Sequence, residues 1–243
     1  VVVTGLFDSE ILQDLTRLQE SAVWKSRRGF HLSRVPDRAW EREWLKHFRP
    51  RRFGRHLWVC PAGLTPEDDG AGVILTLDPG LAFGTGTHET TALCLQWLDA
   101  HPPENLRVLD FGCGSGILAI AAALLGARIV YARDIDPQAL EATRNNALRN
   151  EVADRVLTAP ADGEIPGCDL LISNILAGTL MDLAPNFARA LPGGARVVLS
   201  GILAEQAAAV IEAYSPWFGL QQLAEQDGWI LLFNGKNLDG WRI

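Results

Sequence analysis

From residue 107 onward, short apolar runs alternate with longer segments in which apolar residues recur at helical spacing, and this pattern predicts alternating strands and helices. Strands are predicted at Arg107–Asp110, Ile129–Asp134, Val156–Thr158, Leu170–Asn174, Ala195–Ser200, Gln221–Ala224 and Trp229–Phe233. Helices are predicted at Gly116–Leu125, Pro137–Asn150, Thr179–Ala190 and Leu203–Tyr214. Such alternation gives a doubly wound, mostly parallel α/β sheet. The short connection Glu225–Gly228 makes the last two strands an antiparallel hairpin at its edge.

The chain before this region divides into smaller pieces. Val1–Val3, a helix at Glu10–Glu20 and a strand at Phe30–Val35 predict half of a small α+β domain. Asp37 can cap a linker helix, whose apolar stripe is Trp40, Trp44, Leu45 and Phe48. Strands at Leu57–Cys60 and Val73–Leu77 and a helix at Thr90–Leu98 follow. We therefore expect a partial α+β domain (1–36), a linker helix with a basic segment (37–56) and one α/β domain (57–243).

Composition narrows the class of protein. The 243 residues are 48% hydrophobic, which is enough to bury a full core, and the net charge is −7. That charge argues against general nucleic-acid binding. The four cysteines are scattered, without metal-site spacing or a disulfide framework. The longest apolar run, Ile117–Val130, is too short to span a bilayer. We expect a cytoplasmic, monomeric protein without a membrane or a metal site.

One segment opposes the overall acidity. Arg49, Arg51, Arg52 and Arg55 stand within seven residues of one another, around Pro50, Phe53 and Gly54. Two interpretations stay open. The segment is a solvated linker, or it is a dock for an acidic or RNA-bound partner.

The motif with the most chemistry is the stretch from Val108 to Gly116, which reads Val-Leu-Asp-Phe-Gly-Cys-Gly-Ser-Gly. A buried strand, three alternating glycines and a helix let a ligand lie against bare backbone. The third glycine comes one residue too early for a dinucleotide fingerprint, since position 117 is Ile. Asp110 would repel a pyrophosphate and suits a ligand with a cationic end, such as S-adenosylmethionine. A tight turn that binds nothing is the remaining alternative.

Ligands of such sheets bind beyond the carboxyl ends of the strands, where three candidates are predicted: Asp110 with the glycine turn, Asp134 and Asn174. Asp134 follows the first glycine by about 20 residues, the distance at which an acid meets ribose hydroxyls. Asp136 is a second candidate, but Pro137 after it favours an N-cap role. Asn174 ends the strand Leu170–Asn174, where it is either a turn residue or a ligand contact.

The stretch from Leu77 to Thr91 is rich in glycine and threonine and precedes a helix. Its glycines suggest a lid, and its threonines can cap the helix or hold a ligand carboxylate. A plain capping loop is the alternative. His88 by itself favours a structural role over a catalytic one.

Together these stretches resemble one family. The chain resembles the bacterial methyltransferases that modify the eleventh protein of the large ribosomal subunit. The similar stretches are Leu77–Asp99, Asp110–Asn146, which contains Asp134-Ile135-Asp136-Pro137, and the run from Ser173 to Gly178. The similarity covers nearly the whole chain. The glycine motif alone would indicate only a class I methyltransferase; the loop at Gly80–Thr91 and Asn174 with its three successors are more specific.

The resemblance implies a seven-stranded, Rossmann-like class I fold that uses S-adenosylmethionine and methylates lysine or N-terminal amines of that ribosomal protein. It implies that Thr91, Gly112, Gly114, Asp134 and Asn174 contact the cofactor or line its pocket, and that Phe83–His88 closes over it. Asn174 would also be the catalytic residue, since related amine methyltransferases use an Asn and the next carbonyl to orient the nitrogen. They carry Asn-Pro-Pro-Tyr, whereas this chain has Asn-Ile-Leu-Ala and would have a more open pocket.

Three features depart from the family pattern. Only about half of the recognition domain is visible, Glu89 stands where the family usually has Pro, and Leu238–Ile243 runs past the usual end. The first departure puts docking of the ribosomal protein in doubt, while cofactor binding should survive it.

Overall fold

The structure is a computed structural model, and it describes residues 49–66, 72–78 and 88–234. All of them belong to the second of two compact units, Trp40–Ile243; the first is Val1–Ala39. The helices and strands expected before residue 49 and the loop expected at 79–87 lie outside the described residues. Among the described helices, none has the length and apolar character needed to cross a membrane.

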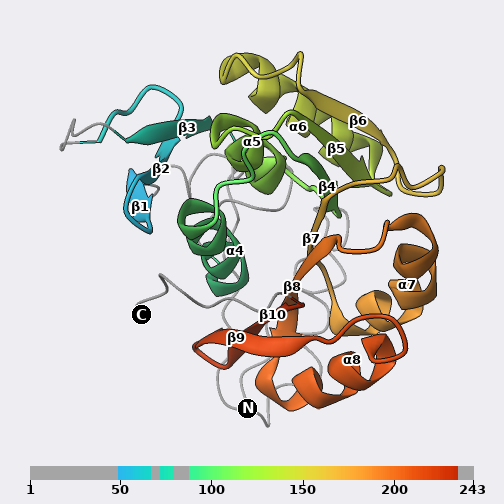
Figure 1. Cartoon of the computed structure of the whole chain (residues 1–243). Coiled ribbons are helices and arrows are strands. Elements are labelled where there is room, and N and C mark those ends of the chain that lie inside the picture. Colours follow the sequence, from blue (N-terminus) through green and yellow to red (C-terminus); the bar gives the residue numbers. More distant parts are fainter. Residues whose placement is uncertain (1–48, 67–71, 79–87, 235–243) are drawn as a thin grey trace, which may run out of the picture. The chain divides into compact units, whose positions relative to one another are not determined.

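A seven-stranded sheet forms the centre of this unit, with the strand order β6-β5-β4-β7-β8-β10-β9 (Figure 1). The strands from β6 to β8 in this order are parallel, and β10 is antiparallel to both β8 and β9. The strands are β4 Arg107–Phe111, β5 Ile129–Asp134, β6 Val156–Pro160, β7 Leu170–Asn174, β8 Arg196–Leu203, β9 Gln221–Gln226 and β10 Trp229–Phe233. The predicted α/β class and the antiparallel edge hairpin are confirmed.

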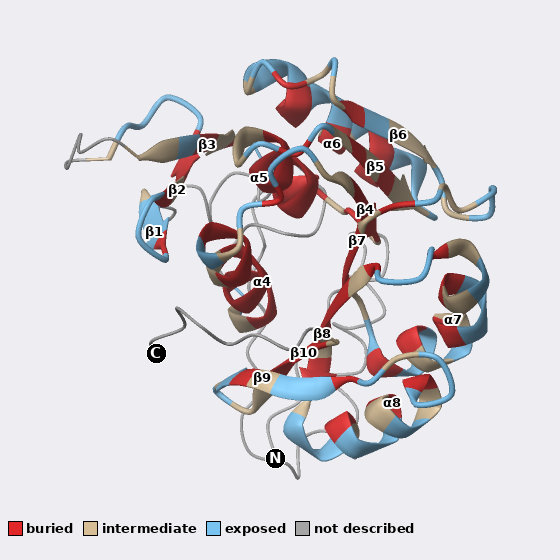
Figure 2. Cartoon of the chain, viewed as in Figure 1, coloured by how far each residue is buried: buried red, intermediate tan, exposed pale blue. Residues whose placement is uncertain are grey.

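Helices cover both faces of the sheet, and α6, α7 and α8 have their exposed residues on the side away from it (Figure 2). They are α4 Glu89–Ala100, α5 Ile117–Leu124, α6 Pro137–Arg149, α7 Ala177–Ala190 and α8 Ala207–Tyr214, with a short 3-10 helix at Ala204–Gln206 before α8. The core accordingly has two hydrophobic clusters. One holds α4 and α5 residues with inner residues of β4, β5 and β7, and the other holds residues of α7 and α8.

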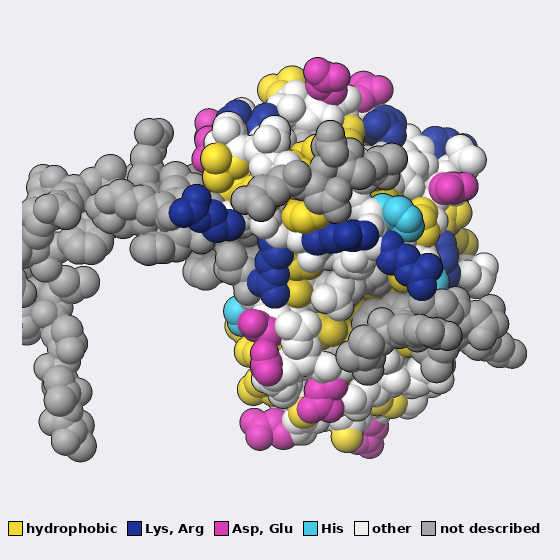
Figure 3. All heavy atoms as spheres, turned by 90° about the vertical axis from the view of Figure 1, so that its left-hand side faces the viewer, with side chains coloured by type: hydrophobic (Ala, Val, Ile, Leu, Met, Phe, Trp, Pro, Cys, Tyr) yellow, Lys and Arg dark blue, Asp and Glu magenta, His cyan; other side chains and the backbone are white. Residues whose placement is uncertain are grey.

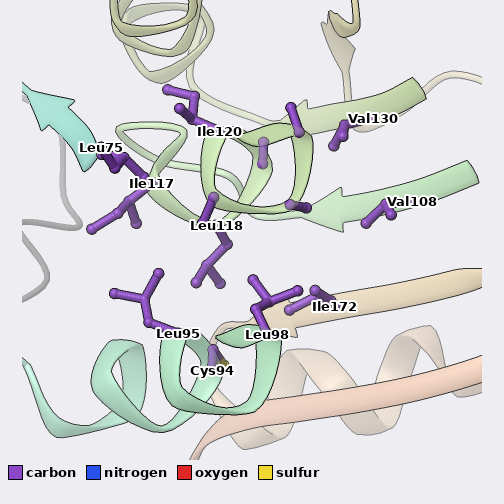
Figure 4. Packing of buried hydrophobic residues seen from close by; sticks show 14 of the residues in the cluster. Leu75, Cys94, Leu95, Leu98, Val108, Ile117, Leu118, Ile120, Val130 and Ile172 are labelled. Atoms are coloured by element: carbon purple, nitrogen blue, oxygen red, sulfur yellow. The ribbon is translucent and has the colours of Figure 1, made fainter. Parts of the chain in front are cut away.

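Helix α5 lies in the middle of the first cluster, and seven of its eight residues are buried. Figure 4 shows Leu118 pointing toward Leu95 and Leu98 of α4, while Ile117 lies beside Leu75 of β3. A short, wholly apolar helix of this kind is stable only when it is packed on all sides. This packing fixes the helix start, and the start of α5 is where the glycine turn ends.

A second sheet of three strands, β1 Arg51–Phe53, β2 Leu57–Pro61 and β3 Val73–Leu77, adjoins α4 and α5. Asp99, near the end of α4, holds the turn between β1 and β2. Its carboxylate accepts hydrogen bonds from the backbone N–H groups of Arg55, His56 and Leu57 at 2.6, 3.0 and 2.8 Å. Gly54 makes this approach possible, because a side chain there would overlap Asp99.

Several elements end one to three residues away from their predicted bounds, and three differences have an identifiable reason. The basic segment, expected to be a linker, contains strand β1. Helix α7 begins at Ala177, two residues before the predicted Thr179, and its N-cap Leu176 offers no side-chain hydrogen bond that could have signalled this start. The helix predicted from Leu203 begins later, since β8 runs to Leu203 and Ala204–Gln206 is a 3-10 turn.

Candidate functional site

The glycine turn joins β4 to α5 at the carboxyl edge of the sheet. Gly112, Gly114 and Gly116 all have positive φ, at 83°, 55° and 82°. Residues with a Cβ rarely adopt this conformation, so the alternating glycines are what lets the backbone follow this path. The turn is held by Arg133 of the neighbouring strand, whose carbonyl accepts from the N–H groups of Gly112 and Cys113 at 2.8 and 3.0 Å.

Asp110 is buried between this turn and α5. One carboxylate oxygen, Oδ2, accepts from the Ala119 N–H at 2.9 Å, while Oδ1 has no hydrogen-bond partner among the described residues. Burial raises the pKa of Asp110 to about 7, and the nearby Asp134 carboxylate adds to the rise. A buried carboxylate with an unsatisfied oxygen is the environment in which a cationic group would be stabilised.

Asp134 ends β5 and lies against the same turn, where its Oδ2 accepts from the Gly114 N–H at 2.9 Å. Its Oδ1 accepts from the Asp136 N–H at 3.0 Å. Asp136 caps α6, since its carboxylate accepts from the Gln138 N–H at 2.9 Å. The N-cap interpretation of Asp136 is therefore confirmed.

Helix α6 also holds the glycine turn, through side chains that were not predicted as site residues. Thr143 donates to the Gly114 carbonyl at 3.1 Å, and Asn146 donates to the Ser115 carbonyl at 3.0 Å. The Asn146 amide oxygen accepts from the Asp78 N–H at 3.0 Å, so it also holds the end of β3. Polar residues at positions 143, 146 and 150 share one face of the predicted helix, and that spacing was the available signal.

Asn174 lies at the tip of β7, beside the start of α4. Its Nδ2 donates to the Thr91 Oγ1 at 3.2 Å, which joins two residues 83 positions apart. Next along the chain, the Ile175 side chain lies so close to Gly112 that any side chain at Gly112 would overlap its Cγ2. These contacts connect all five predicted residues, Thr91 and Asn174 on one side and Gly112, Gly114 and Asp134 on the other.

His88 has a structural position. It is the N-cap of α4, its Nδ1 accepting from the Thr90 N–H at 3.3 Å, and its ring contacts Trp229 edge to face at 4.9 Å. The structural interpretation of His88 is confirmed, and the expectation that a threonine caps this helix is wrong. An imidazole reaches the same backbone donors because the residue precedes the helix in extended conformation.

Two large apolar side chains stand exposed on the rim of the site. Ile135, just after Asp134, is 88% exposed, and Leu176, two residues after Asn174, is 75% exposed. Both follow the carboxyl ends of parallel strands, β5 and β7. Exposed aliphatic groups that flank a polar site are suited to cover an apolar part of a ligand.

Two hollows among the described residues lie elsewhere. A cavity of about 610 Å³ is lined by Asn105 and Gly126, and one of about 590 Å³ is lined by Arg196 and Trp217. Both border the amino ends of the strands, away from the glycine turn. The arginines Arg51, Arg52 and Arg55 are exposed on the β1 side, where Figure 3 shows arginine side chains spread across the face. Arg51 lies over the Phe53 ring at 5.3 Å. Because the segment contains strand β1 it is not a plain linker, and a dock for an acidic or RNA-bound partner stays a prediction.

The residues around the turn fit S-adenosylmethionine better than a dinucleotide. Asp110 with its unsatisfied oxygen and Asp134 place two carboxylates at the turn, which suits a cationic end and disfavours a pyrophosphate. The open-edged sheet, the alternating glycines and an acid at the end of the next strand define a class I S-adenosylmethionine-dependent methyltransferase.

The chain belongs to the ribosomal protein L11 methyltransferase (PrmA) family, whose sequence model matches residues 1–237. The ribosomal protein L11 methyltransferase of Methylococcus capsulatus is 57% identical over 201 residues, which cover 82% of this chain and 68% of that protein. That of Hahella chejuensis is 48% identical over 239 residues, covering 97% and 80%. The crystal structure of a ribosomal protein L11 methylase from Lactobacillus delbrueckii subsp. bulgaricus superposes with a TM-score of 0.68 at 33% identity, covering 76% of this chain and 97% of that one.

Proposed function

We propose that this methyltransferase adds methyl groups to amines of ribosomal protein L11, at lysine side chains, at the N-terminal amine, or at both. The names of its relatives support the protein substrate. The observation that carries the amine chemistry is the position of Asn174, an uncharged amide fixed by Thr91 beside the cofactor turn. We further propose that the enzyme acts as a monomer in the cytoplasm, without binding nucleic acid.

Asn174 is proposed as the catalytic residue. Because its Nδ2 donates to Thr91, its Oδ1 is the atom left to accept an N–H of the incoming amine. The carbonyl of Ile175 is the second acceptor. Two acceptors bind the two N–H groups of a neutral primary amine and so fix the direction of its lone pair, which means that this part of the chain contributes mainly orientation.

Five residues would hold the cofactor: Thr91, Gly112, Gly114, Asp134 and Asn174. Asp134 would bind the ribose hydroxyls. S-adenosylmethionine, when bound, supplies a methyl group on a sulfonium that is a good leaving group. The substrate amine must first lose a proton. Partial dehydration at the rim formed by Ile135 and Leu176 lowers its pKa, and solvent then takes the proton.

The test is mass spectrometry of purified L11 after incubation with the enzyme and S-adenosylmethionine. Mass gains in steps of one methyl are expected, and digestion would assign them to lysines or to the N-terminus. Replacement of Asn174 by Ala should lower the rate about a hundredfold, the cost of losing a positioned polar contact to the reacting group.

Asn145 supplies the matched control, because it is exposed on α6 and its replacement by Ala should leave the rate unchanged. Calorimetry should show that the Asn174→Ala protein still binds S-adenosylmethionine. If the parent enzyme binds the cofactor but leaves L11 unmodified, the protein is a cofactor-binding protein or acts on another substrate. An Asn174→Ala enzyme at full rate would contradict the proposed role of Asn174 alone.

A further inference from the structure

Ile175 is enclosed by backbone from two directions. On one side is Gly201 in β8, which has a φ of 81°. A Cβ at Gly201 would overlap the Ile175 carbonyl oxygen and would lie 2.8 Å from its carbonyl carbon and 3.0 Å from its nitrogen. Real Cβ atoms essentially never come this close to a backbone, so the path of the chain through Ile175 depends on the absence of a side chain at Gly201.

Gly201 lies in a β-bulge. In the pairing of β8 with β10, Leu199 is opposite Leu232 and Ile202 is opposite Ile230, so Ser200 and Gly201 together face Leu231. Ser200 extends the bulge toward α4, since its Oγ lies 3.2 Å from the Thr90 carbonyl and 3.3 Å from that of Ile230. Bulges next to active sites commonly re-aim the residues around them. This one contacts both segments that form the amine site, the start of α4 through Thr90, next to Thr91, and the end of β7 through Ile175, next to Asn174.

The other side of Ile175 meets the cofactor turn. A Cβ at Gly112 would overlap only the Cγ2 of Ile175, and the next atom, Ile175 Cβ, is 3.7 Å away. The contact with Gly112 therefore involves the Ile175 side chain, whereas the contact with Gly201 involves its backbone. One residue thus touches the cofactor turn and the bulge at once.

We propose that Ile175 is a positioning residue, held between Gly112 and Gly201, that sets where its own carbonyl and Asn174 meet the substrate amine. The proposal rests on the function proposed above. It follows that a side chain at Gly201 displaces the amine acceptors without altering the glycine turn. It also follows that a side chain at Gly112 acts through the Cγ2 of Ile175, and that shortening Ile175 relieves this effect.

The first experiment compares Gly201→Ala with Gly228→Ala. Gly228 has a φ of 79°, and a Cβ added there would meet no atom of the described residues within 4 Å, so it carries the same conformational cost without the overlap. Gly201→Ala should lower kcat for L11 methylation about a hundredfold, as a displacement of about 1 Å does, with cofactor affinity equal to that of Gly228→Ala. Equal kcat values for the two variants would overturn the proposal.

The second experiment covers the case in which Gly201→Ala does not fold, and it needs no ribosomal protein. Calorimetry compares S-adenosylmethionine binding by Gly112→Ala, Ile175→Ala and the double variant, with Gly194→Ala (φ 88°, open surroundings) as the control for conformational cost. Gly112→Ala should weaken binding, and adding Ile175→Ala should recover much of the loss. Strictly additive effects would overturn the proposal. If the coupling is present while L11 stays unmodified by the parent enzyme, only the proposed substrate is wrong.

Discussion

Asp110 combines full burial, one hydrogen bond from Ala119 and one oxygen without a partner among the described residues. Because desolvation penalises its charged form, its pKa rises from 3.8 to about 7. A folded-state pKa above the unfolded value means that the contribution of Asp110 to stability is fully present below about pH 4. It is lost progressively as the pH rises through 7.

We therefore expect Asp110→Asn to remove this pH dependence. Without cofactor, the thermal midpoint of the parent should fall relative to that of Asp110→Asn between about pH 5 and about pH 8. Asp169 supplies a control in which stability changes with pH in the opposite direction. Its hydrogen bonds to Arg107 lower its pKa, so its contribution to stability is lost on acidification. A midpoint difference between parent and Asp110→Asn that stays constant with pH would contradict the assignment.

At the scale of elements, α6 connects the cofactor turn to the small sheet. Asn146 bonds Ser115 in the turn and Asp78 after β3, and Asn150 bonds both backbone groups of Thr76 within β3. Asn146 in α6 and Asn150 at its C-cap thus both bind the β3 segment, but only Asn146 bonds the cofactor turn.

This difference gives a paired prediction. Asn146→Ala should weaken S-adenosylmethionine binding about tenfold, since losing one buried hydrogen bond costs about 1.4 kcal/mol. Asn150→Ala should lower the thermal midpoint while leaving the cofactor dissociation constant unchanged. Isothermal calorimetry on both variants is the measurement, and equal losses of affinity would show that α6 acts on the turn only through β3.

The elements were predictable from sequence where the signal is local. Strands β5, β7 and β10 have the predicted bounds because each begins with an apolar run, and polar or glycine residues follow at the strand end or just beyond it. The start of α7 was missed because Leu176 is not a capping residue type, and β1 because a three-residue strand rich in arginine has no alternating pattern.

For the site, alternating glycines and polar residues at strand ends indicated Gly112, Gly114, Asp134 and Asn174 before any contact was known. The contacts between them were not predictable. Periodicity carries no information on the bond between Thr91 and Asn174 or on the approach of Gly201 to Ile175, which depend on how β7, β8 and α4 pack.

At the scale of the whole molecule, two hydrophobic clusters lie on opposite faces of one sheet. Leu98 belongs to the first and Leu180 to the second, and both are fully buried. Because every central strand contributes side chains to both clusters, neither cluster can lose its packing while the other keeps the sheet intact.

Leu98→Ala and Leu180→Ala should therefore each lower the free energy of unfolding by about 2–5 kcal/mol and do so in one transition. Hydrogen–deuterium exchange followed by mass spectrometry should show β4 and β10 losing protection together in both variants. Leu148→Ala is the control, since Leu148 is 65% exposed and its loss should change little. Separate loss of protection on the two faces would mean that the clusters fold independently.

The place of β10 in the sheet has a consequence for how the enzyme is made. Although β10 is the last described strand in sequence, it lies between β8 and β9, and its Phe233 packs against Trp97 while its Trp229 contacts His88 at the start of α4. During synthesis, earlier parts of a chain can begin to fold first. The central sheet and the placement of α4 beside Asn174 are therefore complete only once residue 233 has been synthesised, which is later than every residue predicted for the site.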